Sequence, residues 1–215
     1  MPPSPLNETA ERPAAVASTP VPDRHAQGPA TPLIVDLDGT LLRTDTLFEA
    51  IADLLKRRPL WTLLQMLVLP FAIARTKAKL QGAARLDVDT LPENAEVLEY
   101  CYEAHAADRP VWLVSAADQK TVEMVAARFG VFDRAIGSDG KLNNKGGAKA
   151  RLLAKECPQG FEYIGDSPAD HKVWATASHA SVVGGGPSRL ARIRKSGAQI
   201  VRQFERPKPT LRVWV

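Results

Sequence analysis

Two carboxylates end a short apolar run, where residues 33–42 read LIVDLDGTLL. In an extended strand the side chains at positions i and i+2 lie on one face, so Asp36 and Asp38 present both charges to the same side. Two carboxylates at this separation repel each other. A protein that keeps both places a cation beside them, or it raises the pKa of one and holds a proton there. Either arrangement suits catalysis better than architecture.

Further polar residues follow strand-like segments later in the chain. Ser115 comes directly after VWLV, Asp166 comes directly after FEYIG, and Lys145 precedes the helix that leads into the second of these segments. In doubly wound sheets, ligands bind outside the carboxyl ends of the strands. We therefore expect Asp36, Asp38 and Asp166 to meet one hydroxyl and one ammonium group in a single crevice.

This set of side chains suits a phosphoryl group. Carboxylate and carbonyl oxygens are the hard ligands that Mg²⁺ prefers, and the ion keeps positions for water and for a phosphate oxygen. A bound Mg²⁺ would relieve the repulsion between the carboxylates and neutralise the charge of the phosphate. The expected cofactor is therefore Mg²⁺, and the expected substrate is a small phosphate ester.

The elements that must position these residues alternate between strands and helices along the chain. Asp118 is placed to cap a helix that runs to Phe129, and Gly130 is a typical stop. Alternation of this kind predicts an α/β fold with a doubly wound, mainly parallel sheet of the Rossmann type. The expected strands are residues 33–35, 111–114, 161–164 and 181–183, with a further helix at 148–155.

A helical segment interrupts the sheet. We expect residues 31–42 and 93–190 to form the core, and residues 43–92 to form a helical cap inserted between them. Residues 59–74 carry no charge and are flanked by basic residues on both sides. They are fewer than the roughly 20 residues that a spanning helix needs. Two interpretations stay open: a packed pair of helices, or a helix that lies at a membrane interface.

The two ends of the chain differ from the core in composition. Residues 1–30 are rich in Pro and Ala, which predicts a disordered tail. Residues 191–215 read as a basic linker, because residues 189–215 carry eight Lys or Arg against one acid, and the remainder has a net charge of −3. Such a segment is a solvated linker or contacts an anionic lipid surface. We expect no nucleic-acid partner, and two unpaired cysteines indicate a reducing, cytoplasmic location.

Four short motifs in this order resemble those of the haloacid dehalogenase superfamily. They are DLDGT at 36–40, VWLVSA at 111–116, NKGGAK at 144–149 and GDSPAD at 165–170. The resemblance runs from about residue 33 to residue 186. Within the superfamily, the chain is most similar to the phosphoserine-phosphatase-like members, which have a helical cap of the C1 type. This resemblance implies hydrolysis of phosphomonoesters through an aspartyl-phosphate intermediate.

The resemblance also implies a role for each acidic residue. Asp36 would be the nucleophile that attacks phosphorus, and Asp38 would protonate the leaving alcohol and later activate water. Asp36, the backbone carbonyl of Asp38 and Asp166 would bind Mg²⁺, while Asp170 would brace these ligands. Members of the superfamily that remove halides lack the second acid, so Asp38 favours an oxygen leaving group.

Three further residues would bind the phosphoryl group by the same resemblance. The Ser115 hydroxyl and the Ala116 backbone N–H would donate to its oxygens. Lys145 would screen the charge between nucleophile and substrate, because it directly precedes Gly146 as in the phosphoserine-phosphatase-like pattern. Lys149 lies within reach of the same helix start and stays open as the alternative.

The leading interpretation is a Mg²⁺-dependent phosphatase, with an isoprenoid or lipid phosphate among its candidate substrates because the cap is apolar. The chain is also similar to the N-terminal domain of UbiA-family prenyltransferases, which are membrane enzymes. This similarity implies a fused or associated membrane prenyltransferase and a location at the inner face of the membrane. The alternatives are a non-catalytic accessory domain of such an enzyme and a phosphotransferase or mutase.

Overall fold

The computed structural model describes residues 31–68, 73–139 and 144–206 of the 215-residue chain. The tail predicted for residues 1–30 lies outside the described residues, as does the end of the predicted basic linker. Within the described residues, no helix is both long enough and apolar enough to cross a membrane.

Six parallel strands form a single sheet in the order β3-β2-β1-β4-β5-β6. The central strands are apolar on both faces, as strands covered by helices on both sides must be. This topology confirms the predicted doubly wound α/β fold. The strands are β1 Leu33–Val35, β2 Val111–Asp118, β3 Arg134–Ser138, β4 Glu162–Gly165, β5 His179–Val183 and β6 Gln199–Phe204.

The strand order reverses at β1, which pairs with β2 on one side and with β4 on the other. Leu33 is in register with Val111 of β2 and with Glu162 of β4. In doubly wound sheets the crevice at such a switch point is where ligands bind. The residues that follow β1 and β4 therefore face the same space.

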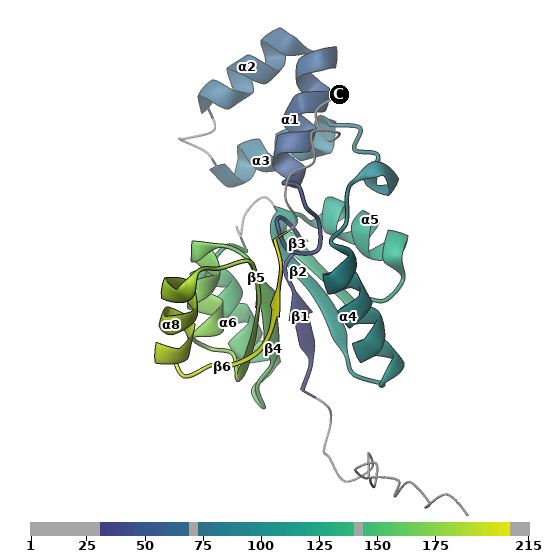
Figure 1. Cartoon of the computed structure of the whole chain (residues 1–215). Coiled ribbons are helices and arrows are strands. Elements are labelled where there is room, and N and C mark those ends of the chain that lie inside the picture. The colour runs from purple at the N-terminus through teal and green to yellow at the C-terminus, as the bar shows by residue number, and fades with distance from the viewer. Residues whose placement is uncertain (1–30, 69–72, 140–143, 207–215) are drawn as a thin grey trace, which may run out of the picture.

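Helices cover both faces of the sheet (Figure 1). Alternate side chains of the strands point to opposite faces, so the sheet has a separate apolar core on each side. Leu33 and Val35 pack under the first pair of helices, and Ile34 packs under the second group. The first pair is α4 Ala95–Ala106 and α5 Gln119–Phe129, and the second group is α6 Gly147–Glu156, α7 His171–Trp174 and α8 Pro187–Lys195.

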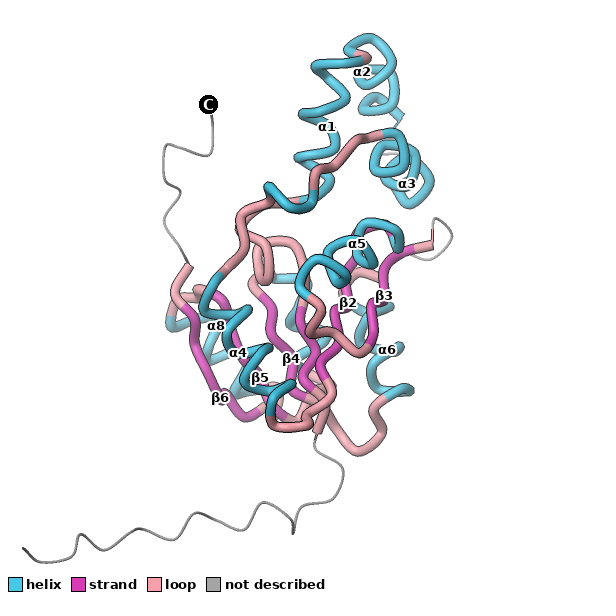
Figure 2. Tube along the Cα trace, turned by 90° about the vertical axis from the view of Figure 1, so that its right-hand side faces the viewer, coloured by secondary structure: helices cyan, strands magenta, loops and turns pink. Residues whose placement is uncertain are grey.

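The cap is inserted between β1 and α4, and Figure 2 shows it beyond the carboxyl end of the sheet. The two connections to the cap run side by side, because the Arg43 N–H donates to the Pro92 carbonyl at 2.8 Å and the Asn94 N–H donates to the Leu41 carbonyl at 2.7 Å. The cap consists of α1 Thr46–Arg57, α2 Pro59–Val68, α3 Ile73–Ala83 and the short 3-10 helix η1 Val88–Thr90.

Helix α3 joins the cap to the end of β2. The Gln81 side chain donates to the Thr46 hydroxyl at 3.1 Å, and it accepts from the Asp118 N–H at 2.9 Å. Lys77 Nζ lies 3.4 Å from the Ala116 carbonyl oxygen. These contacts place α3 over one side of the crevice.

The sheet continues beyond residue 190, where the sequence predicted a basic linker. Helix α8 ends at Lys195, and β6 adds a sixth strand after it. Ile193 and Phe204 are buried in the two cores, while the basic residues of the segment point outward. These two buried apolar residues are far apart in a segment of basic composition, so the sequence pattern did not reveal them. The linker prediction was therefore wrong for residues 191–204.

Candidate active site

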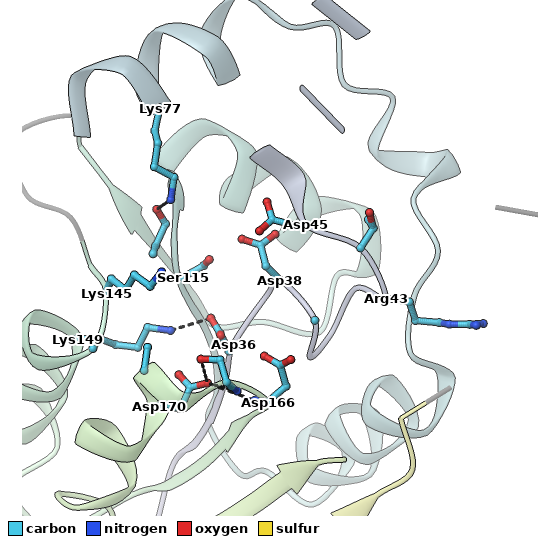
Figure 3. Close-up of a pocket in the computed structure, with 16 residues that line it drawn as sticks. Asp36, Asp38, Arg43, Asp45, Lys77, Ser115, Lys145, Lys149, Asp166 and Asp170 are labelled. Carbon is cyan, nitrogen blue, oxygen red and sulfur yellow. Dashed lines mark hydrogen bonds and ion pairs between the residues drawn. The ribbon is translucent and has the colours of Figure 1, made fainter. Parts of the chain in front are cut away.

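Asp36 follows β1 and lies almost fully buried at the switch point of the sheet. Its Oδ1 accepts a hydrogen bond from Lys149 Nζ at 2.7 Å, which makes a buried ion pair (Figure 3). Burial raises the pKa of Asp36 to about 7, although Lys149 opposes this rise. The structure thus combines the two arrangements that the sequence left open, a cation beside one carboxylate and a raised pKa.

Lys149 connects Asp36 to a second acidic residue through a buried tyrosine. Its Nζ also donates to the Tyr163 hydroxyl at 2.9 Å, and that hydroxyl donates to Asp170 Oδ1 at 2.7 Å. Tyr163 lies on β4 and was not identified from the sequence, where it reads as an ordinary core aromatic. Its side chain lies on the same face of the sheet as α6, in the core that the strands form with that helix.

The two lysines that the sequence left open have different positions. Lys149, in the first turn of α6, is buried against Asp36. Lys145 precedes the helix and lines the pocket that contains Asp36. Within the described residues, Lys145 forms no ion pair. The structure thus places Lys149 against the carboxylate that the sequence analysis assigned to Lys145.

Asp38 is held by the first residue of the cap. Its Oδ1 accepts a hydrogen bond from the Thr46 N–H at 2.8 Å. Burial and the charge of Asp45 raise the pKa of Asp38 to about 6, and the bond from Thr46 lowers it. A carboxyl group with a pKa near neutrality can both give and take a proton at physiological pH.

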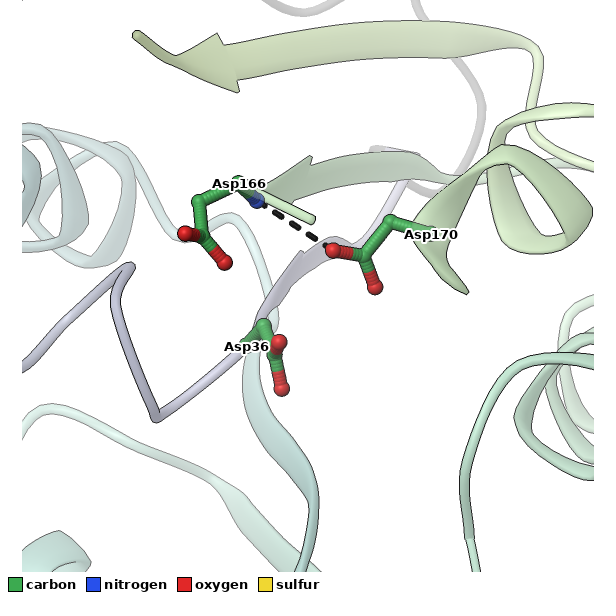
Figure 4. A group of neighbouring side chains, drawn as sticks. All are labelled: Asp36, Asp166 and Asp170. Atoms are coloured by element: carbon green, nitrogen blue, oxygen red, sulfur yellow. Dashed lines mark hydrogen bonds between the residues drawn. The ribbon is translucent and has the colours of Figure 1, made fainter. Parts of the chain in front are cut away.

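Asp36, Asp166 and Asp170 form an acidic group whose ligand atoms lie within 4.8 Å of one another (Figure 4). Asp170 Oδ2 accepts from the backbone N–H groups of Asp166 at 3.2 Å and of Ser167 at 2.9 Å, so it also fixes the loop after β4. A set of carboxylate oxygens from three positions fits a hard divalent cation such as Mg²⁺. The predicted ligands Asp36 and Asp166 are in this group, and the Asp38 side chain is directed to Thr46 instead.

Two arginines close the outer side of Asp166. Arg206, just after β6, places Nη2 2.6 Å from Asp166 Oδ2 and 3.3 Å from its carbonyl oxygen. Arg189 of α8 donates to the same carbonyl. Burial raises the pKa of Asp166, and the nearby Arg206 guanidinium acts in the opposite direction. Neither arginine was identified from the sequence: Arg206 lies in the segment that was expected to be a linker, and Arg189 lies at the very end of the expected core.

Ser115 and Ala116 lie where β2 departs from regular pairing. The strand was expected to end at Val114, but it continues to Asp118 with a register shift between these two residues. Ser115 is buried, and its Oγ accepts a hydrogen bond from the Ala117 N–H at 3.0 Å. An irregularity of this kind takes backbone groups out of the regular ladder, and the Ala116 carbonyl accepts instead from the Ser138 hydroxyl at 3.0 Å.

These residues line one cavity of about 390 Å³ between the cap and the core. The cap contributes Lys77 to its wall, and the connection into the cap contributes Arg43, Thr44 and Asp45. The lining is predominantly polar and charged, with five carboxylates and four basic side chains, which suits a small polar ligand better than an apolar one. The core contributes Asp36, Asp38, Gly39, Ser115, Ala116, Lys145, Gly146, Lys149, Asp166, Ser167, Ala169 and Asp170.

Gly39 allows the two acidic loops to approach each other. Its φ is +75°, and a Cβ added there would lie 2.6 Å from Asp166 Oδ2. We expect Gly39→Ala to displace Asp166 and to reduce phosphate release at least about tenfold, because both the clash and the positive φ disfavour a side chain. Phosphate release and thermal unfolding of the variant measure the two effects.

Gly82→Ala is the matched control for this substitution. Gly82 lies in α3, and a Cβ added there would meet nothing within 4 Å. Alanine favours a helix over glycine by about 1 kcal/mol, so this control should unfold at an equal or higher temperature and keep its activity. If Gly39→Ala were as active as the parent, the proposal that position 39 requires glycine for the approach of Asp166 would be contradicted.

The chain thus combines a parallel α/β sheet, carboxylates beyond two neighbouring strands and an inserted helical cap. Residues 33–174 match the family of haloacid dehalogenase-like hydrolases, and the chain belongs to this family. The family assignment confirms the resemblance seen in the sequence motifs.

Among curated proteins, the chain is 36% identical over 173 residues to the uncharacterised protein y4nM of Sinorhizobium fredii. This match covers 79% of the chain and 33% of y4nM, so the chain spans about a third of the length of that relative.

Solved structures share the fold at low sequence identity. A protein of unknown function from Bordetella pertussis Tohama I has a TM-score of 0.62 at 14% identity, covering 81% of this chain and 99% of that one. Phosphoserine phosphatase in its apo form has a TM-score of 0.55 at 18% identity, covering 86% of this chain and 99% of that one. A phospho-aspartyl intermediate analogue of phosphoserine phosphatase has the same TM-score and identity.

Proposed function

We propose that the chain is a Mg²⁺-dependent phosphatase that hydrolyses phosphomonoesters through an aspartyl-phosphate at Asp36. The observation that carries this proposal is the buried Asp36–Lys149 ion pair within the acidic group of Asp36, Asp166 and Asp170. A lysine and a divalent cation beside one carboxylate would let it approach a phosphate dianion, which it would otherwise repel.

The side chains of Asp36 and Asp166 and the backbone carbonyl of Asp38 would hold Mg²⁺, and Asp170 would either join them or brace the loop that carries Asp166. When bound, the ion would neutralise charge on the phosphoryl oxygens. The fit rests on the donor set, because all of these groups offer oxygen atoms and three of the carboxylates converge within 4.8 Å.

The first displacement would transfer the phosphoryl group to the protein. An Asp36 oxygen would attack phosphorus while the bond from phosphorus to the ester oxygen breaks, and protonated Asp38 would give its proton to the departing alkoxide. The Ser115 hydroxyl, the Ala116 N–H and the Lys145 and Lys149 ammonium groups would hold the phosphoryl oxygens. The bond from Thr46 would keep Asp38 aimed at the leaving group.

The second displacement would regenerate the enzyme. Ionised Asp38 would take a proton from a water molecule, which would attack phosphorus and release Asp36 and inorganic phosphate. The pKa of Asp38, about 6, suits a group that must change its protonation state twice in each cycle. The cap would limit the access of bulk water to the cavity.

The cavity favours a small, charged phosphate ester. The residues that the cap and its connections contribute to the lining of the cavity are Arg43, Thr44, Asp45 and Lys77, while the leucines of α2 lie outside it. The apolar composition of the cap therefore supports an isoprenoid or lipid phosphate less than the sequence suggested. A phosphate ester with a second negative charge near the phosphate is the leading substrate class, because Lys77 and Lys145 both line the cavity.

The proposal is tested by phosphate release from an aryl phosphate and from a panel of sugar, amino-acid and isoprenoid phosphates. Release should require Mg²⁺ and stop in the presence of a chelator, and small charged esters should react fastest. Adding acceptor alcohols separates hydrolysis from transfer, since a mutase or phosphotransferase would form a new ester. No release from any of these substrates would favour the accessory, non-catalytic domain.

Arg206 should compete with Mg²⁺ for Asp166, because its guanidinium already pairs with the Asp166 carboxylate. We expect Arg206→Ala to bind Mg²⁺ about two- to fivefold more tightly, since an exposed ion pair contributes up to about 1 kcal/mol. Calorimetric titration with Mg²⁺ measures this change. Arg202→Ala is the control, because Arg202 lies on β6 and pairs with Glu103 and not with Asp166. The affinity of this variant for Mg²⁺ should equal that of the parent.

A further inference from the structure

Helix α2 of the cap has an inverted pattern of burial. Thr62 is its one buried residue, and the Thr62 hydroxyl donates to the Arg58 carbonyl at 2.8 Å. The side chains at spacings of three and four residues on the opposite side are all leucines. Leu60, Leu63, Leu64 and Leu67 are 83%, 55%, 57% and 72% exposed. A helix that packs on a core normally buries such a stripe, so this leucine face is suited to a partner outside the cap.

The leucine face lies at the outer end of the molecule. Figures 1 and 2 both place α2 at the end of the cap that is farthest from the sheet. The face also lies outside the cavity, whose lining includes no residue of α2. Its leucines are therefore free to contact a flat surface without blocking the active site.

The surroundings of this face are strongly basic. Residues 54–86 carry seven Lys or Arg and no Asp or Glu. Lys56 and Arg58 are exposed next to the start of α2, and Arg75 and Lys79 are exposed on α3, which packs beside it. An apolar helix face bordered by cations is the pattern of helices that lie in the interface of an anionic bilayer.

We propose that the leucine face of α2 docks on an anionic lipid bilayer, with its leucines at the boundary of the acyl chains and the flanking basic residues against lipid headgroups. A second copy of the chain is a poorer partner, because a symmetric dimer through this face would bring two acid-free, basic segments together. The proposal does not rest on the phosphatase activity, since none of these residues lines the cavity.

Vesicle sedimentation of the 215-residue chain tests the proposal. We expect the chain to sediment with vesicles of phosphatidylcholine that contain phosphatidylglycerol, to bind phosphatidylcholine alone at least about tenfold more weakly, and to dissociate as salt rises. Replacing Leu63 and Leu67 together with Ser should reduce binding to the anionic vesicles at least about tenfold, because both side chains are exposed and would lose contact with the acyl chains.

The control replaces Val201 with Ser, since this exposed apolar residue lies on β6, the edge strand of the sheet, and not in the cap. This variant should bind the vesicles as the parent does. If the Leu63 and Leu67 variant bound the vesicles as strongly as the control variant, the basic segments alone would account for the binding, and the role of the leucine face would be overturned. Self-association in sedimentation velocity that is lost in the Leu63 and Leu67 variant, without binding to vesicles, would assign the face to a second copy and overturn the proposal.

Discussion

Asp36→Asn is expected to reduce phosphate release at least about 10⁴-fold, because the amide neither attacks phosphorus nor carries the negative charge that an ion beside it needs. Asn has nearly the same shape as Asp, so the buried position after β1 should tolerate it. Release of phosphate from an aryl phosphate in the presence of Mg²⁺ measures the effect, and circular dichroism checks that the fold is kept.

Asp89→Asn is the matched control for this variant. Asp89 lies in η1, is exposed, and does not line the cavity. Its substitution makes the same chemical change and should leave release unchanged. If Asp36→Asn kept more than a tenth of the parent activity, Asp36 would not be the nucleophile.

Lys149→Met is expected to reduce phosphate release about 10²- to 10³-fold, which is the usual cost of removing one group that stabilises developing charge. The substitution keeps the length of the side chain and removes the cation that is 2.7 Å from Asp36. It also removes the charge and the hydrogen bond of Lys149, both of which lower the pKa of Asp36, so the carboxylate would be less ionised near pH 7.

Lys145→Met separates the two lysines. Lys145 lines the cavity and has no ion pair with Asp36, so its loss should raise KM and lower kcat/KM by about tenfold or less. Measuring kcat and KM for both variants decides between them. A larger loss of kcat in Lys145→Met than in Lys149→Met would restore the assignment that the sequence favoured and would contradict the role given to Lys149.

Much of the core was predictable because its signals are local. Asp118 caps α5, Gly130 ends that helix with a φ of 64°, and the apolar runs of β1 and β2 are continuous. Asp36 and Asp166 were predictable for the same reason, since each directly follows a strand, whereas the role expected for Asp170 came from the family resemblance. Residues at the ends of parallel strands meet wherever the strands are neighbours.

The remaining features depend on contacts between distant segments. Strand order, the position of β6 and the pairing of Arg206 with Asp166 follow from packing across the sheet, which no local pattern reports. The choice between Lys145 and Lys149 depended on how Gly146 and Gly147 begin α6. The first turn of that helix directs Lys149 to the Tyr163 hydroxyl and to Asp36.

The cap was the least predictable part, because its apolar residues do not follow the usual rule of burial. The uncharged run at 59–74 predicted either a packed pair of helices or an interfacial helix. In α2 the leucines face outward and Thr62 faces inward. The apolar composition of the cap therefore did not indicate which of its residues line the cavity. The cavity beneath the cap is lined mainly by polar and charged residues of the core and of the connection into the cap.

Asp36 is the residue proposed to carry the phosphoryl group, and this role can be tested directly. Beryllofluoride mimics a phosphoryl group on an aspartate, and its binding is visible by fluorine NMR without any knowledge of the natural substrate. The parent chain with Mg²⁺ should give a signal from bound beryllofluoride, and Asp36→Asn or a chelator should abolish it. A parent chain that gives no bound signal with Mg²⁺, or an Asp36→Asn variant that still gives one, would contradict the account.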